Sequence, residues 1–184
     1  MQIRRSKGVC ALTMTAAAAA AMGVLAPWSV PFGPIPVSLC TLLIYLMAYI
    51  MGWKQAFTAV LVYVLMGAAG LPVFSGFTGG LGVLAGPTGG FVLGYLPMSA
   101  LCALTVKKAS KPRGVQLGGM LGATGVLYLL GTVWYCAQAQ VGVWGGVAVC
   151  VLPFLPGDGV KMLAALIVGP ALNDRMARAG LLDR

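Results

Sequence analysis

Three long stretches without a single charged residue constrain this chain more than any other feature of its sequence. They comprise the 46 residues between Lys7 and Lys54, the 52 between Lys54 and Lys107, and the 44 between Arg113 and Asp158. A helix needs about 20 mainly apolar residues to cross the hydrocarbon core of a bilayer. Each of the first two stretches therefore has room for two membrane-spanning helices and an uncharged turn, and the third for one helix, a turn and the start of another.

The composition excludes both a water-soluble domain and a disordered chain. Of the 184 residues, 60% are hydrophobic and only 8% are charged, and the mean hydropathy is +0.95. In soluble domains about a quarter of the residues are charged, and disordered segments contain few hydrophobic residues. We therefore expect an all-α integral membrane protein in which residues 1–184 form a single domain surrounded by lipid.

Gly and Pro residues mark the turns between six predicted membrane-spanning helices. Pro27–Pro36 holds four prolines, whereas the turn at Gly52–Lys54 is very short. The last helix contains Pro153 and Pro156, so it is either strongly tilted or broken near Pro156. The predicted helices cover roughly residues 9–26, 36–51, 56–71, 90–106, 116–137 and 145–172.

Lys and Arg residues occur in alternate connections only. They precede the first predicted helix, separate the second from the third and the fourth from the fifth, and follow the sixth. Because cytoplasmic loops carry the excess of Lys and Arg, both termini should lie in the cytoplasm (N-in/C-in). The same distribution explains the net charge of +9 without a nucleic-acid partner. A cleaved signal peptide is the alternative for the first helix, but its removal would place the C-terminal arginines opposite the other basic loops.

The scarcity of reactive side chains excludes several kinds of chemistry. There is no Glu or His and there are three Asp residues, which disfavours carboxylate-pair hydrolysis, His-based catalysis and His-ligated metal sites. The five Cys residues are widely spaced in apolar sequence without a CxxC pair, as is typical of buried hydrophobic positions. We expect neither an enzyme nor a bound metal or cofactor.

Asp158 and Lys161 form the first feature that points to a binding site. They lie three residues apart, so on a helix both face the same side, and both fall within a hydrophobic run. Charges inside a membrane are costly and usually mark a substrate or ion pathway. A salt bridge that only holds the helices together is the alternative, although such a pair would leave ammonium protons and carboxylate lone pairs for a ligand.

The second feature is an uncharged segment, residues 70–90, in which eight of 21 residues are Gly. No ordinary helix has that composition, and glycine lets backbone approach a ligand closely. The segment lies between the third and fourth predicted helices, on the outer side. We interpret it as a lid or re-entrant segment over an outward-facing pocket; a merely flexible external loop is the alternative. No Gly-Lys-Ser/Thr follows, so it is not a phosphate loop.

The third feature is a run of alanines on the first predicted helix. Ala16 with Ala20, and Ala17 with Ala21, form small-xxx-small faces that let helices pack closely. Whether the packing partner is internal or another subunit stays open at this point.

Two of these segments resemble the motifs of the BioY family, the biotin-binding substrate components of energy-coupling-factor (ECF) transporters. The segment 70–90 followed by Phe-Val-Leu-Gly-Tyr resembles the first motif, and Leu-Pro-Gly-Asp at 155–158 with Lys161 resembles the second. The resemblance implies a six-helix biotin-binding protein of the bacterial cytoplasmic (inner) membrane. It also implies a transmembrane coupling protein, docked by Ala16, Ala17, Ala20 and Ala21, and two cytoplasmic ATPases, which alone would use ATP.

The resemblance also assigns residues to the pocket. Asp158 and Lys161 match the family motif, and Thr78 stands where relatives place an amide side chain. In chemical terms, Asp158 can accept a ureido N–H of biotin and Lys161 can donate to the ureido oxygen. The candidates for contact with the ring system of biotin are the aromatic residues Phe74, Phe77, Tyr95 and Trp134. The candidates for contact with its carboxylate are the backbone N–H groups of Gly79, Gly80 and Gly89.

Two alternative functions stay open on the sequence. The chain would act as a substrate component for another vitamin, because these components share one fold and only the motifs select biotin. Alternatively it would act as a proton-coupled secondary transporter with Asp158 as the proton carrier, although no internal repeat is apparent.

Overall fold

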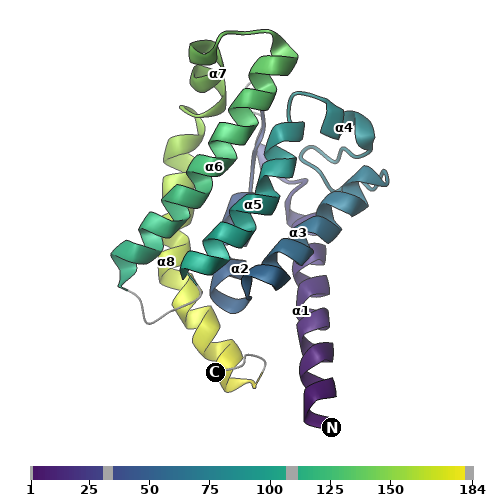
Figure 1. The fold of residues 1–184 in the computed structure, drawn as a ribbon, viewed down its shortest axis with the longest axis vertical. Helices are drawn as coiled ribbons and strands as arrows, with labels where there is room; N and C mark the ends of the chain where they lie inside the picture. Colours follow the sequence, from purple (N-terminus) through teal and green to yellow (C-terminus); the bar gives the residue numbers. More distant parts are fainter. Residues whose placement is uncertain (1, 31–34, 107–111, 181–184) are drawn as a thin grey trace.

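The computed structural model of the chain describes residues 2–30, 35–106 and 112–180, with side chains from residue 8 onward. This part of the chain forms eight helices and two short strands (Figure 1). In chain order these are α1 (Gln2–Leu25), β1 (Ser29–Val30), β2 (Val37–Ser38), α2 (Cys40–Ile50), α3 (Trp53–Ala68), α4 (Leu81–Ala85), α5 (Gly89–Val106), α6 (Arg113–Ala139), α7 (Val143–Cys150) and α8 (Phe154–Arg178).

The long helices form a bundle around α5. Helix α5 packs on α6, α3 and α2, while α2 also packs on α8 and α1 rests mainly against α3. The short helices α4 and α7 lie at the end of the bundle opposite the first turn of α1 and the last turns of α8 (Figure 1). Both ends of the described chain therefore lie on the same side of the bundle.

Four described helices are long and apolar enough to cross a membrane, namely α1, α5, α6 and α8. Helices α2 and α3 are apolar but have only 11 and 16 residues, fewer than the ~20 that a span perpendicular to the bilayer needs. The prediction of a largely helical, multi-pass membrane protein is confirmed at this level, and the boundaries of 90–106 agree closely with α5.

One predicted boundary is wrong, and one open alternative is decided. Residues 36–39 do not begin α2, because Val37 and Ser38 pair antiparallel with Val30 and Ser29 in a small sheet, so the described chain is not purely helical. The predicted helix 145–172 is broken, which was one of the two alternatives for it: α7 and α8 are separated at residues 151–153. The break precedes Pro156, which lies in the first turn of α8, where a missing N–H leaves no hydrogen bond unmade.

The Gly-rich segment is more ordered than its composition indicates. It contains α4 and a tight turn in which the amide of Phe74 donates to the carbonyl of Thr78 (2.9 Å). Gly76 and Gly80 adopt positive φ angles, and their amides donate to Pro27 and Gly67. The segment is therefore fastened to the ends of α1 and α3, which argues against a merely flexible loop.

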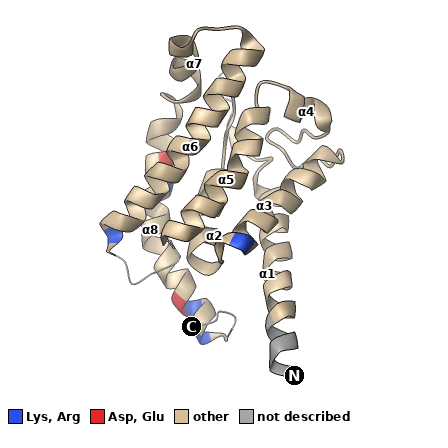
Figure 2. Ribbon diagram, in the orientation of Figure 1, with Lys and Arg blue, Asp and Glu red and all other residues tan. Residues whose placement is uncertain are grey.

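Among the residues whose side chains the structure describes, the charged ones lie at one end of the bundle and at one site in its interior. Lys and Arg colouring falls at the starts of α3 and α6 and on the last turns of α8, and none falls on α4 or α7 (Figure 2). Asp158 and Lys161 lie midway along the bundle. This separation is the pattern expected of a protein whose basic end faces the cytoplasm.

Glycines let aromatic rings lie directly against neighbouring helices. An ideal Cβ on Gly131 of α6 would lie 2.5 Å from the ring of Phe91, and one on Gly90 of α5 would overlap Trp134. These close approaches hold α5 and α6 together and bring Phe91 to the centre of the bundle. Of the five cysteines, Cys40, Cys102 and Cys150 are buried in the core and the other two are half-buried.

Candidate functional site

A cavity of about 370 Å³ lies inside the bundle, between the Gly-rich segment and the Asp158–Lys161 pair. Its polar end is lined by Ser38, Thr41, Tyr128, Asp158 and Lys161, and its other walls come mainly from the Gly-rich segment and α5. Ligand pockets typically measure about 300–1,000 Å³ and have mostly apolar walls with a few placed polar groups. The cavity therefore has the size and character of a small-molecule site.

The charged pair sits on α8 as its spacing predicts. The Lys161 ammonium lies 3.0 Å from Oδ1 of Asp158, and the two side chains are only 12% and 5% exposed. A buried charge needs an opposite charge and hydrogen bonds to offset its lost hydration. Asp158 and Lys161 supply each other with the opposite charge, and neighbouring residues on other elements supply the hydrogen bonds.

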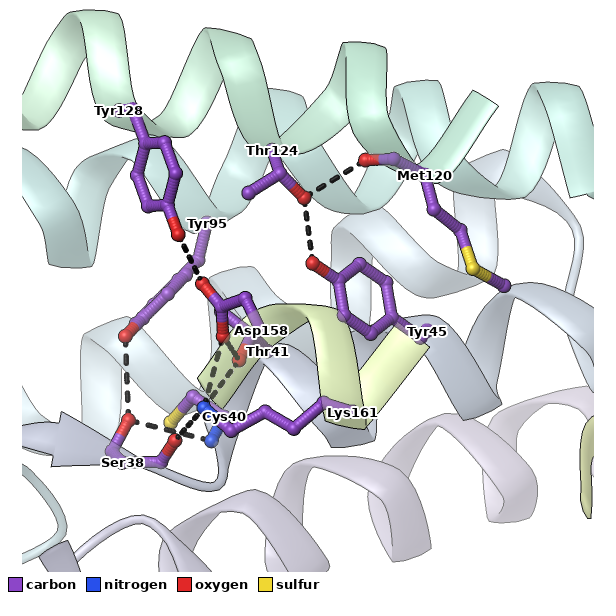
Figure 3. A network of polar contacts seen from close by, with 10 residues as sticks. All are labelled: Ser38, Cys40, Thr41, Tyr45, Tyr95, Met120, Thr124, Tyr128, Asp158 and Lys161. Carbon is purple, nitrogen blue, oxygen red and sulfur yellow. Dashed lines mark hydrogen bonds and ion pairs between the residues drawn. The ribbon is translucent and has the colours of Figure 1, made fainter. Parts of the chain in front are cut away.

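Asp158 receives hydrogen bonds from three elements of the bundle. Thr41 of α2 donates to Oδ1 (2.9 Å), and Tyr128 of α6 donates to Oδ2 (2.7 Å). Lys161 donates not only to Asp158 but also to the backbone oxygen of Ser38 (2.8 Å) and to Oγ1 of Thr41 (3.0 Å). Figure 3 shows this network, which joins β2, α2, α6 and α8 around one carboxylate.

A second polar contact lies next to the charged pair. The Tyr45 hydroxyl lies 2.6 Å from Thr124 Oγ1, which donates to the backbone oxygen of Met120 (2.8 Å). Thr124 has one proton, so Tyr45 is the donor of the pair. Tyr45 is fully buried and does not line the cavity, so its contact with Thr124 lies outside the candidate site.

Among the predicted aromatic residues, Phe74 and Tyr95 line the cavity. Phe74 is buried and packs edge-on against Tyr63, with ring centroids 5.7 Å apart. The hydroxyl of Tyr95 lies 3.4 Å from Oγ of Ser38. These rings form apolar walls that lead to the polar end.

Thr78 and Phe77, the other predicted side chains of the Gly-rich segment, differ in their placement. Thr78 lines the cavity, and its hydroxyl donates to the backbone oxygen of Ser75 (3.0 Å). Phe77 points away, with 58% of its surface exposed and its ring against Trp28.

The glycines predicted to meet a ligand serve the shape of the segment itself. Gly79 and Gly89 do not line the cavity, and a Cβ on either would overlap the backbone of Leu71 or Leu84. Gly80, which needs its positive φ angle, does not line the cavity either. The indole N–H of Trp134 donates to the oxygen of Gly86 (2.9 Å), so this ring braces the segment from outside the cavity.

Sequence reasoning missed several residues of the site, among them Ser38, Thr41, Tyr128 and Phe91. Phe91 lines the cavity and stacks on Phe154, with ring centroids 6.3 Å apart. Its place directly after the Gly-rich segment was a usable signal. The three hydroxyl residues lie in apolar stretches that carry no motif, and only the packing of the helices brings them to Asp158.

The predicted docking face on α1 is largely free of internal contacts. Ala16, Ala17 and Ala20 are exposed and Ala21 is half-buried, whereas Ala19 on the opposite side is buried in the bundle. The four small residues thus face away from the core of this chain, toward lipid or another protein.

Apolar helices around a ligand-sized cavity with a buried ion pair define a membrane protein that binds a small molecule. The model of the BioY family matches residues 2–178. The match extends over nearly the whole chain, and this chain belongs to the BioY family.

Named relatives and a solved structure agree with this assignment. The biotin transporter BioY2 of Lactococcus lactis is 35% identical, over 88% of each chain. The biotin transporter BioY of Thermotoga maritima is 34% identical, over 83% of this chain and 90% of its own. The crystal structure of an S-component for biotin from an ECF-type ABC transporter superposes with a TM-score of 0.84 at 23% identity, over 92% of this chain and 93% of that chain, which shows a shared fold. Relatives named as transporters agree with the prediction that the chain is not an enzyme.

Proposed function

We propose that this protein binds biotin and takes it up across the bacterial cytoplasmic membrane as the substrate component of an ECF-type transporter. The observation that carries the proposal is the buried Asp158–Lys161 pair at the polar end of a ligand-sized cavity, in a chain of the BioY family. The relatives named as biotin transporters support the same substrate.

The two ends of the cavity match the two ends of biotin. The ureido ring offers N–H donors, and Oδ2 of Asp158 accepts one proton from Tyr128 while keeping a second lone pair. The thioether ring and the aliphatic tail suit the apolar walls around Phe74 and Phe91. We assign the ligand's carboxylate to the end formed by the Gly-rich segment, with Thr78 and nearby backbone N–H groups as its partners.

The proposed topology has six membrane-spanning segments in the single domain 1–184, with both termini in the cytoplasm. The basic ends of α3, α6 and α8 support this orientation, because they gather away from α4 and α7 (Figure 2). The Gly-rich segment then faces outward and covers the cavity from the side on which biotin arrives. In this arrangement α2 and α3 are the two shortest membrane-spanning helices, and β2 extends the segment of α2 at its N-terminal end.

The proposed partners are a transmembrane coupling protein and two cytoplasmic ATPases, and ATP acts only through those ATPases. The exposed small-residue face of Ala16, Ala17 and Ala20 on α1 supports a protein partner there, since small residues let helices approach closely in a membrane. No cofactor of the chain's own is required for binding.

A ligand panel on the purified full-length chain tests the substrate. Calorimetry in detergent should detect tight binding of biotin and no binding of thiamine or riboflavin. Preference for another vitamin would overturn the proposed substrate. Uptake into vesicles that depends on a proton gradient without any ATPase would instead support a secondary transporter.

A further inference from the structure

The three protons of the Lys161 ammonium all have acceptors within the protein. They point to Oδ1 of Asp158, Oγ1 of Thr41 and the backbone oxygen of Ser38, at 2.8–3.0 Å. An ammonium has three donors and no more. The expectation that Lys161 donates to the ligand's carbonyl oxygen therefore requires one of these bonds to break, and a different donor would avoid that cost.

The other donors nearest to the carboxylate are also committed. Thr41 donates to Oδ1 of Asp158 and Tyr128 donates to Oδ2. Each of these hydroxyls has a single proton. Asp158 can accept a ureido N–H, but the groups that bond it directly have no proton left for the neighbouring carbonyl oxygen.

The hydroxyl groups of Ser38 and Tyr95 have one more proton than the hydrogen bond between them uses. Their oxygens lie 3.4 Å apart and share one hydrogen bond, so two protons serve one contact. The Ser38 oxygen also accepts the amide of Cys40 (3.4 Å). With Ser38 donating to Tyr95, the phenolic proton of Tyr95 has the Cys40 sulfur beside it, a weak acceptor that a ligand's carbonyl oxygen can replace, and both Ser38 and Tyr95 line the cavity.

The same two residues are tied to the charged pair. The backbone oxygen of Ser38 accepts a hydrogen bond from the Lys161 ammonium (2.8 Å). Ser38 therefore links the ammonium to Tyr95. In Figure 3 Tyr128, Tyr95 and Ser38 follow one another along one side of Asp158. In a cyclic urea the carbonyl is attached to the same carbon as both N–H groups. A ligand whose N–H meets Asp158 thus presents its carbonyl oxygen within reach of this row of hydroxyls.

We propose that Tyr95 donates the hydrogen bond that recognises the ligand's ureido oxygen, and that Ser38 positions it. Lys161 then acts on the ligand through Asp158 and Ser38 and does not touch the carbonyl. The inference rests on the proposed function, since it concerns how the same cavity recognises the head of biotin. Tyr63 is the rival donor, because its hydroxyl also lines the cavity and accepts from the thiol of Cys40 (3.7 Å).

The test compares biotin with 2-thiobiotin, in which sulfur, a weak acceptor, replaces the ureido oxygen. Calorimetry with the full chain should show that Tyr95→Phe binds biotin about tenfold more weakly than the parent, because the carbonyl loses its partner. The same variant should bind thiobiotin nearly as the parent does. Ser38→Ala should weaken biotin binding by a smaller factor, about threefold, since the Tyr95 donor survives but is less well held. Tyr45→Phe is the matched control, a buried tyrosine outside the cavity, and should bind both ligands as the parent does.

Several results would overturn the inference. They are unchanged biotin binding by Tyr95→Phe, an equal loss for biotin and thiobiotin, and a selective loss for Tyr63→Phe in place of Tyr95→Phe. Should Tyr95→Phe fail to fold, Ser38→Ala with the same two ligands decides the matter. Failure of the parent chain to bind biotin would instead overturn the proposed function, so the two failures are distinguishable.

Discussion

Neutralising Asp158 is the sharpest test of the site. Asp158→Asn keeps the shape of the side chain but removes the charge that Lys161 contacts at 3.0 Å. The amide nitrogen also brings protons to a place where Thr41, Lys161 and Tyr128 all donate, so at least one of these contacts must be lost or reversed. The variant therefore leaves a largely buried ammonium with two neutral partners.

The magnitude follows from the number and kind of contacts. Removing one partner of a buried pair typically costs about 3–5 kcal/mol, and part of that falls on the free protein as lost stability. A hydrogen bond to a charged group contributes roughly 1.5–3 kcal/mol, and this is the part that biotin loses. At about 1.4 kcal/mol per decade, the dissociation constant for biotin should rise some ten- to hundred-fold.

The assay is calorimetric titration of purified, folded variants with biotin, together with their thermal unfolding. Lys161→Met should fall in the same range, and the double variant should lose less than the sum of the two, because the groups act as one unit. Asp174→Asn is the matched control, the same exchange on an exposed position of the same helix, and should change neither quantity. Parent-like biotin binding by both single variants would mean that the pair only holds the helices together.

The other predictions concern docking, topology and packing. Ala20→Leu should weaken co-purification with the coupling protein and leave biotin binding intact, whereas equal loss of both would indicate internal packing. A cysteine introduced within residues 108–112 should resist an impermeant thiol reagent added outside intact cells; labelling there would refute the N-in/C-in topology. Gly131→Ala should lower stability by about 1–3 kcal/mol, because its Cβ would lie 2.5 Å from the ring of Phe91; an unchanged melting temperature would contradict this close packing.

The sequence predicted the membrane fold well because charge and hydropathy act along the chain. The uncharged stretches and the alternating basic loops require no knowledge of tertiary contacts. The start of α2 was missed because Val37 and Ser38 are as compatible with an apolar helix as with a strand. Their pairing with Ser29 and Val30 is a contact between segments that hydropathy cannot reveal.

The polar partners of the site were beyond prediction for a different reason. Hydroxyl residues are common in these helices, and many only bond their own backbone, as Thr13, Thr58 and Thr105 do with a carbonyl four residues earlier. Thr41 and Tyr128 look no different in the sequence, yet their hydroxyls donate to Asp158. Only the packing of α2, α6 and α8 separates the two kinds, whereas an intramembrane charge is conspicuous by itself.

The break between α7 and α8 and the Asp158–Lys161 ion pair are structurally connected. Residues 151–153 separate α7 from α8, so α8 starts part-way along the bundle and Asp158 lies in its second turn (Figure 1). Asp158 lies one turn beyond the start of α8, so its charge is balanced by the Lys161 ammonium and by the hydroxyls of Thr41 and Tyr128. Broken helices of this kind are tolerated in membranes where they line a cavity, and they are used by transporters to present helix ends to a polar ligand group. Lys161 lies one turn further on and supplies the opposite charge, so the helix that follows the break carries both members of the ion pair to the polar end of the cavity.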